Sequence, residues 1–580
     1  AVVFLPVIFL EGFVGRLFRE FGVVLAGAVL ISAFVSLSLT PMLNAKLFRK
    51  NHKHSKFYDD TEPFFQRLNT GYRTILHAFM KVKWMAWVII LACGGLIYLF
   101  NSLLQSELAP LEDRSWFRLI VSAPEGASYE YTDNFMSKLA ASIDDSVPER
   151  RILLTVSAPN FTGSGAVNTG FGRVMLVEPE DRKRSQQQIV DQVTKTVSKF
   201  PEAKTFVIQE QTISAGGGPR GALPVQFVVQ NNDFEKLKTV LPQFMQEIRD
   251  SKVLQGNDIN LKFNKPELQV TINRDKARNV GVSVLDVAQT MQLAFSGQRF
   301  AYFTMNGKQY AVIGQFDRAN RDQPLDLKSI YVRNNKGDLI QLDNVIDVEE
   351  QSNPPQLYHF NRYKSATLSA GLAPGKTIAD GITEMERIKT KLLDDSFATA
   401  LTGAARDYAE SSSNVYFAFL LALILIYLVL AAQFESFIDP VIIMFTVPLA
   451  LAGAYFSLWY FNKTLNIFSQ IGMIMLIGLV TKNGILIVEF ANQLIEKGYK
   501  KSTAIMEAAV LRFRPILMTS IATSLGALPI ALALGAGSNS RTALGVVVVA
   551  GVIFSLIFTL FVIPAMYMYL SRHKDHDHQL

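Results

Sequence analysis

The distribution of apolar residues constrains the fold of this chain more than any other feature. Apolar runs of about twenty residues, the length that spans a bilayer as a helix, lie toward both ends of the 580-residue chain. A long region of mixed polarity separates them. A soluble protein of this length would instead spread its apolar residues over several amphipathic cores. The pattern predicts an α-helical polytopic membrane protein that carries a large water-exposed α+β domain.

Basic residues orient the predicted spans. Segments 44–83 and 491–514 are rich in Lys and Arg, which is typical of loops on the cytoplasmic side. This orientation places residues 104–414 on the opposite, periplasmic side and returns the tail 571–580 to the cytoplasm. The predicted spans are residues 1–10 (cut short), 21–43, 84–103, 415–432, 440–461, 467–490, 515–534 and 543–570.

The basic segment 44–83 also shows a helical pattern. Between residues 63 and 83, apolar residues recur at helical spacing and leave a basic opposite face. This spacing predicts an amphipathic linker helix that lies on the inner membrane surface.

An internal repeat relates the first two spans to the end of the chain. Residues 4–43 align without a gap with residues 527–566. Both copies run outward and then inward, as in transporters whose halves are related by an axis along the membrane normal. We therefore expect residues 1–43 to end a first half, and the chain to be the C-terminal half of a longer protein. The aligned pairs are Pro6 with Pro529, Gly12 with Gly535, Gly22 with Gly545, and Pro41 with Pro564.

The water-exposed region begins with a β-α-β-β-α-β pattern, the split βαβ order of ferredoxin-like domains. Its predicted strands are 117–121, 152–156, 173–177 and 205–209, and its predicted helices are 128–143 and 186–199.

A second unit of the same kind is interrupted by an inserted piece at about residues 280–350. The insert carries the turn signals Asn306-Gly307 and Lys336-Gly337, which predict hairpins. The predicted strands of the second unit are 225–229, 267–272 and 365–370, and its helices are 234–249 and 378–392.

Lys482 and Asn483 stand near the middle of the apolar run 467–490. Lys482 lies about 12 Å from the predicted cytoplasmic end, at 1.5 Å per residue, and a lysine stem snorkels over only part of that distance. An unpaired ammonium in hydrocarbon is costly or loses its proton. The pattern favours an ion pair with a carboxylate on another helix; the alternative is a snorkelling lysine in a misplaced span. The other predicted spans carry no carboxylate at their middle, so we expect the partner upstream of Ala1.

The next span offers two further candidates. Arg514 is interpreted as an interfacial anchor, and Arg512 either does the same or reaches inward to Lys482. Thr519 lies seven residues after Arg512 and shares its helix face. Alternatively, its hydroxyl bonds back to a carbonyl of its own helix.

Several stretches together resemble one family. The strings GLVTKNGILIVEF, LRFRPILMTS, ALPIALALGAGS and AAQFESF are similar to those of the resistance-nodulation-division (RND) permeases, in particular the AcrB- and MexB-like multidrug efflux pumps. The outer stretches 107-ELAPLED-113, 163-GSGAVNTG-170 and 371-GLAPGKT-377 extend the resemblance to essentially the whole chain.

The resemblance implies a proton relay and a drug pocket. Lys482, Asn483, Arg512 and Thr519 match relay positions, and their partners would be aspartates on a helix of the first half. The segment 158–170 matches a glycine-rich switch loop. Phe161, Gly163, Gly165 and Phe171 are the substrate-binding residues it implies.

The resemblance also implies partners and a location. We expect a permease in the inner membrane of a Gram-negative bacterium, driven by the proton motive force and conferring antibiotic resistance. It would form a homotrimer and act with a periplasmic adaptor and an outer-membrane channel. The insert at about 280–350 would be the docking subdomain that meets them.

Other readings of the residues remain open. The same scaffold could export metal ions or a secreted or lipidic molecule, or could serve as a membrane sensor or enzyme. The stretch 371–377 differs from a phosphate loop by one residue of spacing. No catalytic, metal, cofactor or nucleic-acid site is predicted, and the lone Cys93 excludes a disulfide framework.

Overall fold

The computed structural model describes residues 8, 12–47, 56–159, 166–213, 223–317, 320–321, 327, 329–533 and 539–571. The chain forms two compact units. The first comprises Ala1–Ala123, Tyr129–Ile259 and Phe360–Leu580, and the second comprises Pro124–Ser128 and Asn260–His359. Each unit is described by itself.

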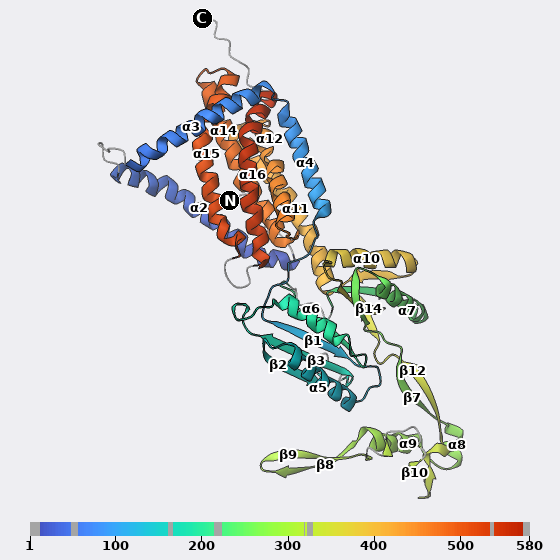
Figure 1. Ribbon diagram of the computed structural model, residues 1–580. Helices are drawn as coiled ribbons and strands as arrows, with labels where there is room; N and C mark the ends of the chain where they lie inside the picture. Colours follow the sequence, from blue (N-terminus) through green and yellow to red (C-terminus); the bar gives the residue numbers. More distant parts are fainter. Residues whose placement is uncertain are drawn as a thin grey trace. The chain divides into compact units, whose positions relative to one another are not determined.

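Long apolar helices dominate the first unit (Figure 1). Seven stretches in the described residues are long and apolar enough to cross a membrane, and each predicted span from residue 21 onward coincides with one of them. The predicted span 1–10 lies, apart from residue 8, outside the described residues. The helices are α2 (Gly12–Leu47), α4 (Met85–Leu103), α11 (Gly403–Phe434), α12 (Asp439–Met444), α13 (Thr446–Tyr460), α14 (Ile467–Glu496), α15 (Lys501–Ala531) and α16 (Asn539–Leu570).

Local sequence sets the ends of α14, the helix that carries Lys482. It begins after Asn466, whose side chain accepts from the backbone N–H of Ser469 while the Ser469 hydroxyl accepts from that of Asn466. It continues past the predicted end at residue 490, because no helix breaker precedes Gly498, which has a φ of 91°.

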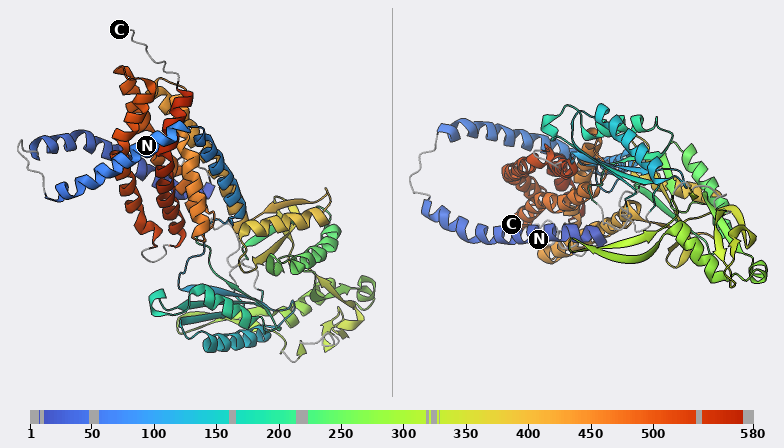
Figure 2. Two further views of the ribbon diagram at one scale, coloured as in Figure 1. Left: turned by 45° about the horizontal axis from the view of Figure 1, so that its top comes forward. Right: turned by 90° about the horizontal axis from the view of Figure 1, so that it is seen from below.

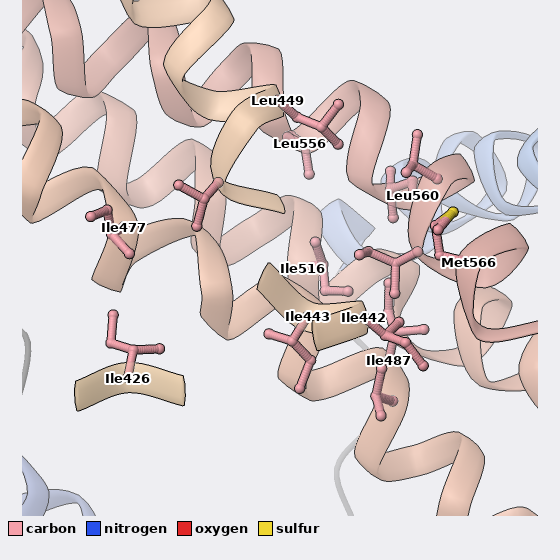
Figure 3. Close-up of a cluster of buried hydrophobic side chains, with 14 of the residues drawn as sticks. Ile426, Ile442, Ile443, Leu449, Ile477, Ile487, Ile516, Leu556, Leu560 and Met566 are labelled. Carbon is pink, nitrogen blue, oxygen red and sulfur yellow. The ribbon is translucent and has the colours of Figure 1, made fainter. Parts of the chain in front are cut away.

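Helices α11 to α16 pack into one bundle, which Figure 2 shows from two further directions. Its centre is a cluster of buried aliphatic side chains drawn from all of them, including Ile426, Leu449, Ile487, Ile516 and Leu556 (Figure 3). Gly551 allows α16 to approach α14 closely, since a Cβ there would collide with Leu476.

The linker helix α3 (Lys56–Lys81) packs against the bundle. Tyr72 stacks on Phe513 of α15 with ring centroids 4.5 Å apart, and its hydroxyl donates to the Leu560 carbonyl of α16 at 2.7 Å. Arg514 donates to Glu62 of α3 at 2.9 Å. The helix was predicted from its amphipathic spacing, and the structure shows that part of its apolar face is covered by protein.

The first sheet has the element order β-α-β-β-α-β and the antiparallel strand order β2-β3-β1-β4. Helices α5 and α6 cover one face of the sheet. Gly170 of β3 lies on this face, where a Cβ would collide with Met136 of α5. Successive side chains of a strand point to opposite faces. Arg118 of β1 and Arg173 of β3 alternate with the buried residues of their strands and therefore lie on the other face. The elements are β1 (Trp116–Ser122), α5 (Tyr129–Ser146), β2 (Arg150–Ser157), β3 (Thr169–Leu176), α6 (Gln186–Val197) and β4 (Lys204–Ile208).

The second sheet corrects one predicted strand. Residues 267–272 were assigned to it, but the strand that follows α7 is β6, which pairs with β14. Its sequence, LQGNDI, contains residues typical of turns, and only the pairing with β14 makes it extended. The elements are β5 (Val225–Gln230), α7 (Phe234–Asp250), β6 (Leu254–Ile259), β14 (Tyr363–Leu372), α10 (Ile378–Leu392) and β15 (Ala398–Leu401).

The second unit contains the residues misassigned above. Strand β7 (Lys265–Ile272) pairs antiparallel with β12 (Ile346–Asn353). The predicted turn Asn306-Gly307 joins β8 (Gln298–Met305) to β9 (Lys308–Gly314), and both turn residues have positive φ. The remaining elements are α8 (Arg274–Asn279), α9 (Val284–Met291), η3 (Gln292–Ser296), β10 (Tyr331–Arg333), β11 (Leu339–Gln341) and η6 (Leu342–Asn344). Strand β13 (Tyr358–Phe360) leads out of this unit and pairs with β14 at the edge of the second sheet.

Candidate functional site

Lys482 faces α15 from the middle of α14. The side chain is half-buried, and its Nζ donates to the hydroxyl of Thr523 at 3.4 Å. In the part of the chain that the structure describes, Lys482 forms no ion pair. A hydroxyl dipole offsets only part of the cost of removing an ammonium from water. Within the described residues, the site therefore carries one positive charge that no carboxylate balances.

Thr523 was not predicted as part of the site. It lies four residues after Thr519, so both side chains fall on one face of α15. The hydroxyl of Thr523 also donates to the Thr519 carbonyl at 2.8 Å, which leaves its lone pairs for the Lys482 ammonium. The same helix-face spacing that selected Thr519 could have found it.

Asn483 makes a second polar contact between the same helices. It is fully buried, and its Nδ2 donates to the Ser520 hydroxyl of α15 at 3.2 Å. Its Oδ1 is buried and has no hydrogen-bond partner among the described residues. An unsatisfied buried carbonyl oxygen costs about 1–3 kcal/mol, so this atom marks a place where another donor fits.

Arg512 and Thr519 make other contacts and form no hydrogen bond to Lys482 in the described part of the chain. The Arg512 guanidinium sits 4.4 Å from the ring centroid of Phe490, eight residues beyond Lys482 on α14. The Thr519 hydroxyl donates to the Ile516 carbonyl at 3.2 Å, which is the back-bonded geometry considered above. Their relay roles stay predictions.

Most of the predicted substrate residues fall outside the described part of the chain. Phe161, Gly163 and Gly165 are in this group. Phe171 lies on β3, directly opposite Ile120 of β1 and Val156 of β2, on the sheet face away from α5 and α6. Its role in substrate binding stays a prediction.

The stretch 107-ELAPLED-113 connects the membrane helices to the first sheet. Glu107 accepts from the Thr464 hydroxyl at 2.6 Å, just before α14. Buried Glu112 accepts from the backbone N–H of Ser540 at 2.5 Å, in the first turn of α16. Asp113 pairs with Arg182 and accepts from the N–H of Gln186 at the start of α6.

Burial raises the pKa of the Glu107 carboxyl, and the hydrogen bond from Thr464 offsets part of that shift. The two glutamates thus hold this connecting stretch against the ends of α14 and α16, while Asp113 holds it against α6.

The family of the chain follows from comparison with known proteins. A family model described as AcrB/AcrD/AcrF matches residues 1–571. The chain belongs to this family. The predicted resemblance to RND permeases is thereby confirmed, and the family is a family of transporters. Membership and the seven long apolar helices together support a multi-pass membrane protein.

Individual relatives align with almost the whole of this chain, but the alignment covers only about half of their own length. An uncharacterized transporter of Haemophilus influenzae is 32% identical over 99% of this chain and 55% of its own. Multidrug resistance protein MdtC of Proteus mirabilis is 29% identical over 98% of this chain and 55% of its own. MdtC of Pectobacterium carotovorum is 30% identical over 99% of this chain and 56% of its own length. The chain spans about half the length of the curated relatives it matches.

Proposed function

We propose that this chain is part of a proton-driven efflux permease that exports hydrophobic and amphiphilic compounds. Family membership supports the transporter class, and the names of two relatives support multidrug substrates. The observation that carries the proton-driven mechanism is the ammonium of Lys482 in the middle of a membrane helix, where its only polar partner among the described residues is the Thr523 hydroxyl.

The chemistry of that ammonium requires an acid. A cation in hydrocarbon is stable only beside a counter-charge. A carboxylate that pairs with Lys482 would weaken this pairing each time it takes up a proton. The unsatisfied Oδ1 of Asn483 would accept a hydrogen bond from the carboxyl once it is protonated. Proton uptake and release would therefore change how a further helix packs on α14 and α15.

The connecting stretch offers a route from this site to the outer sheets. Glu107 is bonded next to the start of α14, and Asp113 is bonded to the first sheet. A shift of α14 would act on the connecting stretch through the first of these bonds. Alternating access of the outer subdomains would then follow from movement of the membrane helices.

We further propose a cellular setting, which the resemblance to the RND permeases implies. The protein would lie in the inner membrane of a Gram-negative bacterium, form a homotrimer, and deliver substrates from the periplasm and inner membrane through an adaptor and an outer-membrane channel. Exposed aromatic side chains on the β8–β9 hairpin, among them Phe300 at 59% and Phe303 at 49%, are candidate contacts for such partners.

Replacement of Lys482 tests the proposal. In the intact gene product, Lys482→Met should abolish energised export of dyes and detergents while the protein still reaches the membrane. Lys497→Met, at the C-terminal end of the same helix, is the matched control and should export normally. Export by Lys482→Met at the control rate, with the same sensitivity to a protonophore, would contradict the mechanism.

A further inference from the structure

Two arginines stand side by side on the helix-free face of the first sheet. In the register of β1 and β3, Arg118 is directly opposite Arg173. Directly opposite side chains lie on the same face with Cβ atoms about 4.5–5.5 Å apart, and two like charges in these positions repel each other. This repulsion is unfavourable for folding, and two apolar residues in these positions would have avoided it.

Both guanidinium groups have unused hydrogen-bonding capacity. The Nε atoms of Arg118 and Arg173 are buried and have no hydrogen-bond partner within the described residues. Arg118 is only 17% exposed, and its nearest carboxylate oxygen, on Glu210, is 3.9 Å away. That carboxylate is shared with Arg114, whose guanidinium nitrogen lies 3.8 Å from it. The Glu210 carboxylate is thus shared between two guanidinium groups, those of Arg114 and Arg118.

Trp116 fixes the orientation of Arg173. The guanidinium carbon of Arg173 lies 4.0 Å from the centroid of the indole ring. A guanidinium stacked on an aromatic face keeps its in-plane N–H groups free for a planar anion. This stacking holds the Arg173 donors in place before any ligand binds, which reduces the entropy cost of binding.

The arginines are surrounded by apolar side chains on the same face. Ile152 and Leu154 of β2 are each 50% exposed, and Leu154 is directly opposite Arg173. Ile120 and Phe171 form the next cross-strand pair along the sheet. Phe206 of β4 abuts Gly256 of β6, where a Cβ would lie 3.2 Å from the ring, so the second sheet borders this surface.

We propose that this sheet face binds amphiphilic anions: the paired guanidinium groups of Arg118 and Arg173 take the carboxylate or sulfonate head, and the apolar side chains around them take the tail. An anion relieves the repulsion between the arginines and satisfies donors that are otherwise buried and unused. Bidentate guanidinium–carboxylate pairs are among the strong hydrogen bonds in proteins. This inference rests on the proposed export function and names a substrate class for it.

Energy transfer from Trp116 to a dansyl group reports binding at this face. A background variant with Trp84→Phe, Trp87→Phe and Trp459→Phe leaves Trp116 as the only tryptophan. The purified chain in nanodiscs is titrated with 11-(dansylamino)undecanoic acid and with its uncharged methyl ester. We expect the acid to bind at least tenfold more tightly than the ester, and added salt to weaken only the acid.

Substitutions separate charge from packing. Arg118→Gln with Arg173→Gln should weaken the acid at least tenfold and leave the ester within twofold, whereas Arg118→Lys with Arg173→Lys should retain most of the preference. Arg150→Gln, which removes a guanidinium paired with Asp144 in the same domain, is the matched control. Dodecanoate should displace the probe, and phosphatidylglycerol in the nanodisc should not; displacement by the lipid alone would identify a lipid site instead.

Several results would overturn the inference. These are equal binding of acid and ester, equal weakening of both by the Gln variants, or a salt dependence shared by the ester. The salt series needs no arginine variant, so it decides the question even if the Gln variants fold poorly. If the chain binds the anion but does not support energised export, the proposed transport function is rejected and this inference stands. If the acid and the ester are exported equally, this inference is rejected and the transport function stands.

Discussion

At the scale of single residues, Thr523 changes the interpretation of Lys482. Its hydroxyl accepts from the ammonium and donates to the carbonyl one turn earlier, so it holds the lysine toward α15. A lysine held in this way presents its charge to whichever helix packs beside α14 and α15. We therefore propose that Thr523 positions Lys482 and does not itself carry a proton.

Thr523→Val tests that assignment, because valine has the same shape and no hydroxyl. A net hydrogen bond to a charged group contributes about 1.5–3 kcal/mol, so we expect energised export to fall roughly tenfold or more and its pH optimum to shift. Thr523→Ser should restore both. Transport rates measured over a pH series check this, and an unchanged pH profile in Thr523→Val would argue against the positioning role.

At the scale of secondary-structure elements, the beginning of α16 depends on a residue distant in sequence. Glu112 is buried and accepts from the Ser540 N–H, where the positive end of the helix dipole favours a carboxylate. The bond joins the connecting stretch to the last membrane helix.

We expect Glu112→Gln to lower the free energy of unfolding by about 1 kcal/mol, because the amide keeps an acceptor and loses the charge. Thermal unfolding in detergent measures the effect. Glu180→Gln, an exposed carboxylate in the first turn of η2 (Pro179–Asp181), is the control and should change little. A larger loss for the control than for Glu112→Gln would contradict the capping role.

At the scale of the whole molecule, the stretch 105–113 joins the membrane helices to the first sheet within one compact unit. Besides its side-chain bonds, it pairs with residues just before α14 through the backbone of Leu465, which donates to the Gln105 carbonyl at 2.8 Å and accepts from the Glu107 N–H at 3.1 Å. Stability of this junction should therefore depend on the charge of Glu107.

The sign of that dependence follows from the raised pKa of Glu107. A carboxyl whose pKa is higher in the folded state favours folding below its unfolded pKa, and this contribution is lost as the pH rises through the folded pKa. We expect Glu107→Gln to remove this part of the pH dependence. Unfolding temperatures of wild type and variant across about pH 4 to 8 check it; parallel curves would exclude Glu107 as the titrating group.

The sequence by itself determined the features that depend on local pattern. Long apolar runs predicted the membrane helices, and the alternation of apolar and polar residues predicted strands such as β1 and β3. Asn306-Gly307 predicted a hairpin. Each of these features depends only on residues near one another in the chain. Membership in the AcrB/AcrD/AcrF family was accessible from motifs around Lys482 and Arg512.

Only the tertiary structure decided which distant residues meet. The strand order placed β6 in the second sheet and moved residues 267–272 elsewhere, because pairing partners overrode a turn-like sequence. The register of β1 and β3 brought Arg118 opposite Arg173, and helix packing set Thr523 against Lys482. Such contacts join residues tens of positions apart, and no local periodicity specifies them.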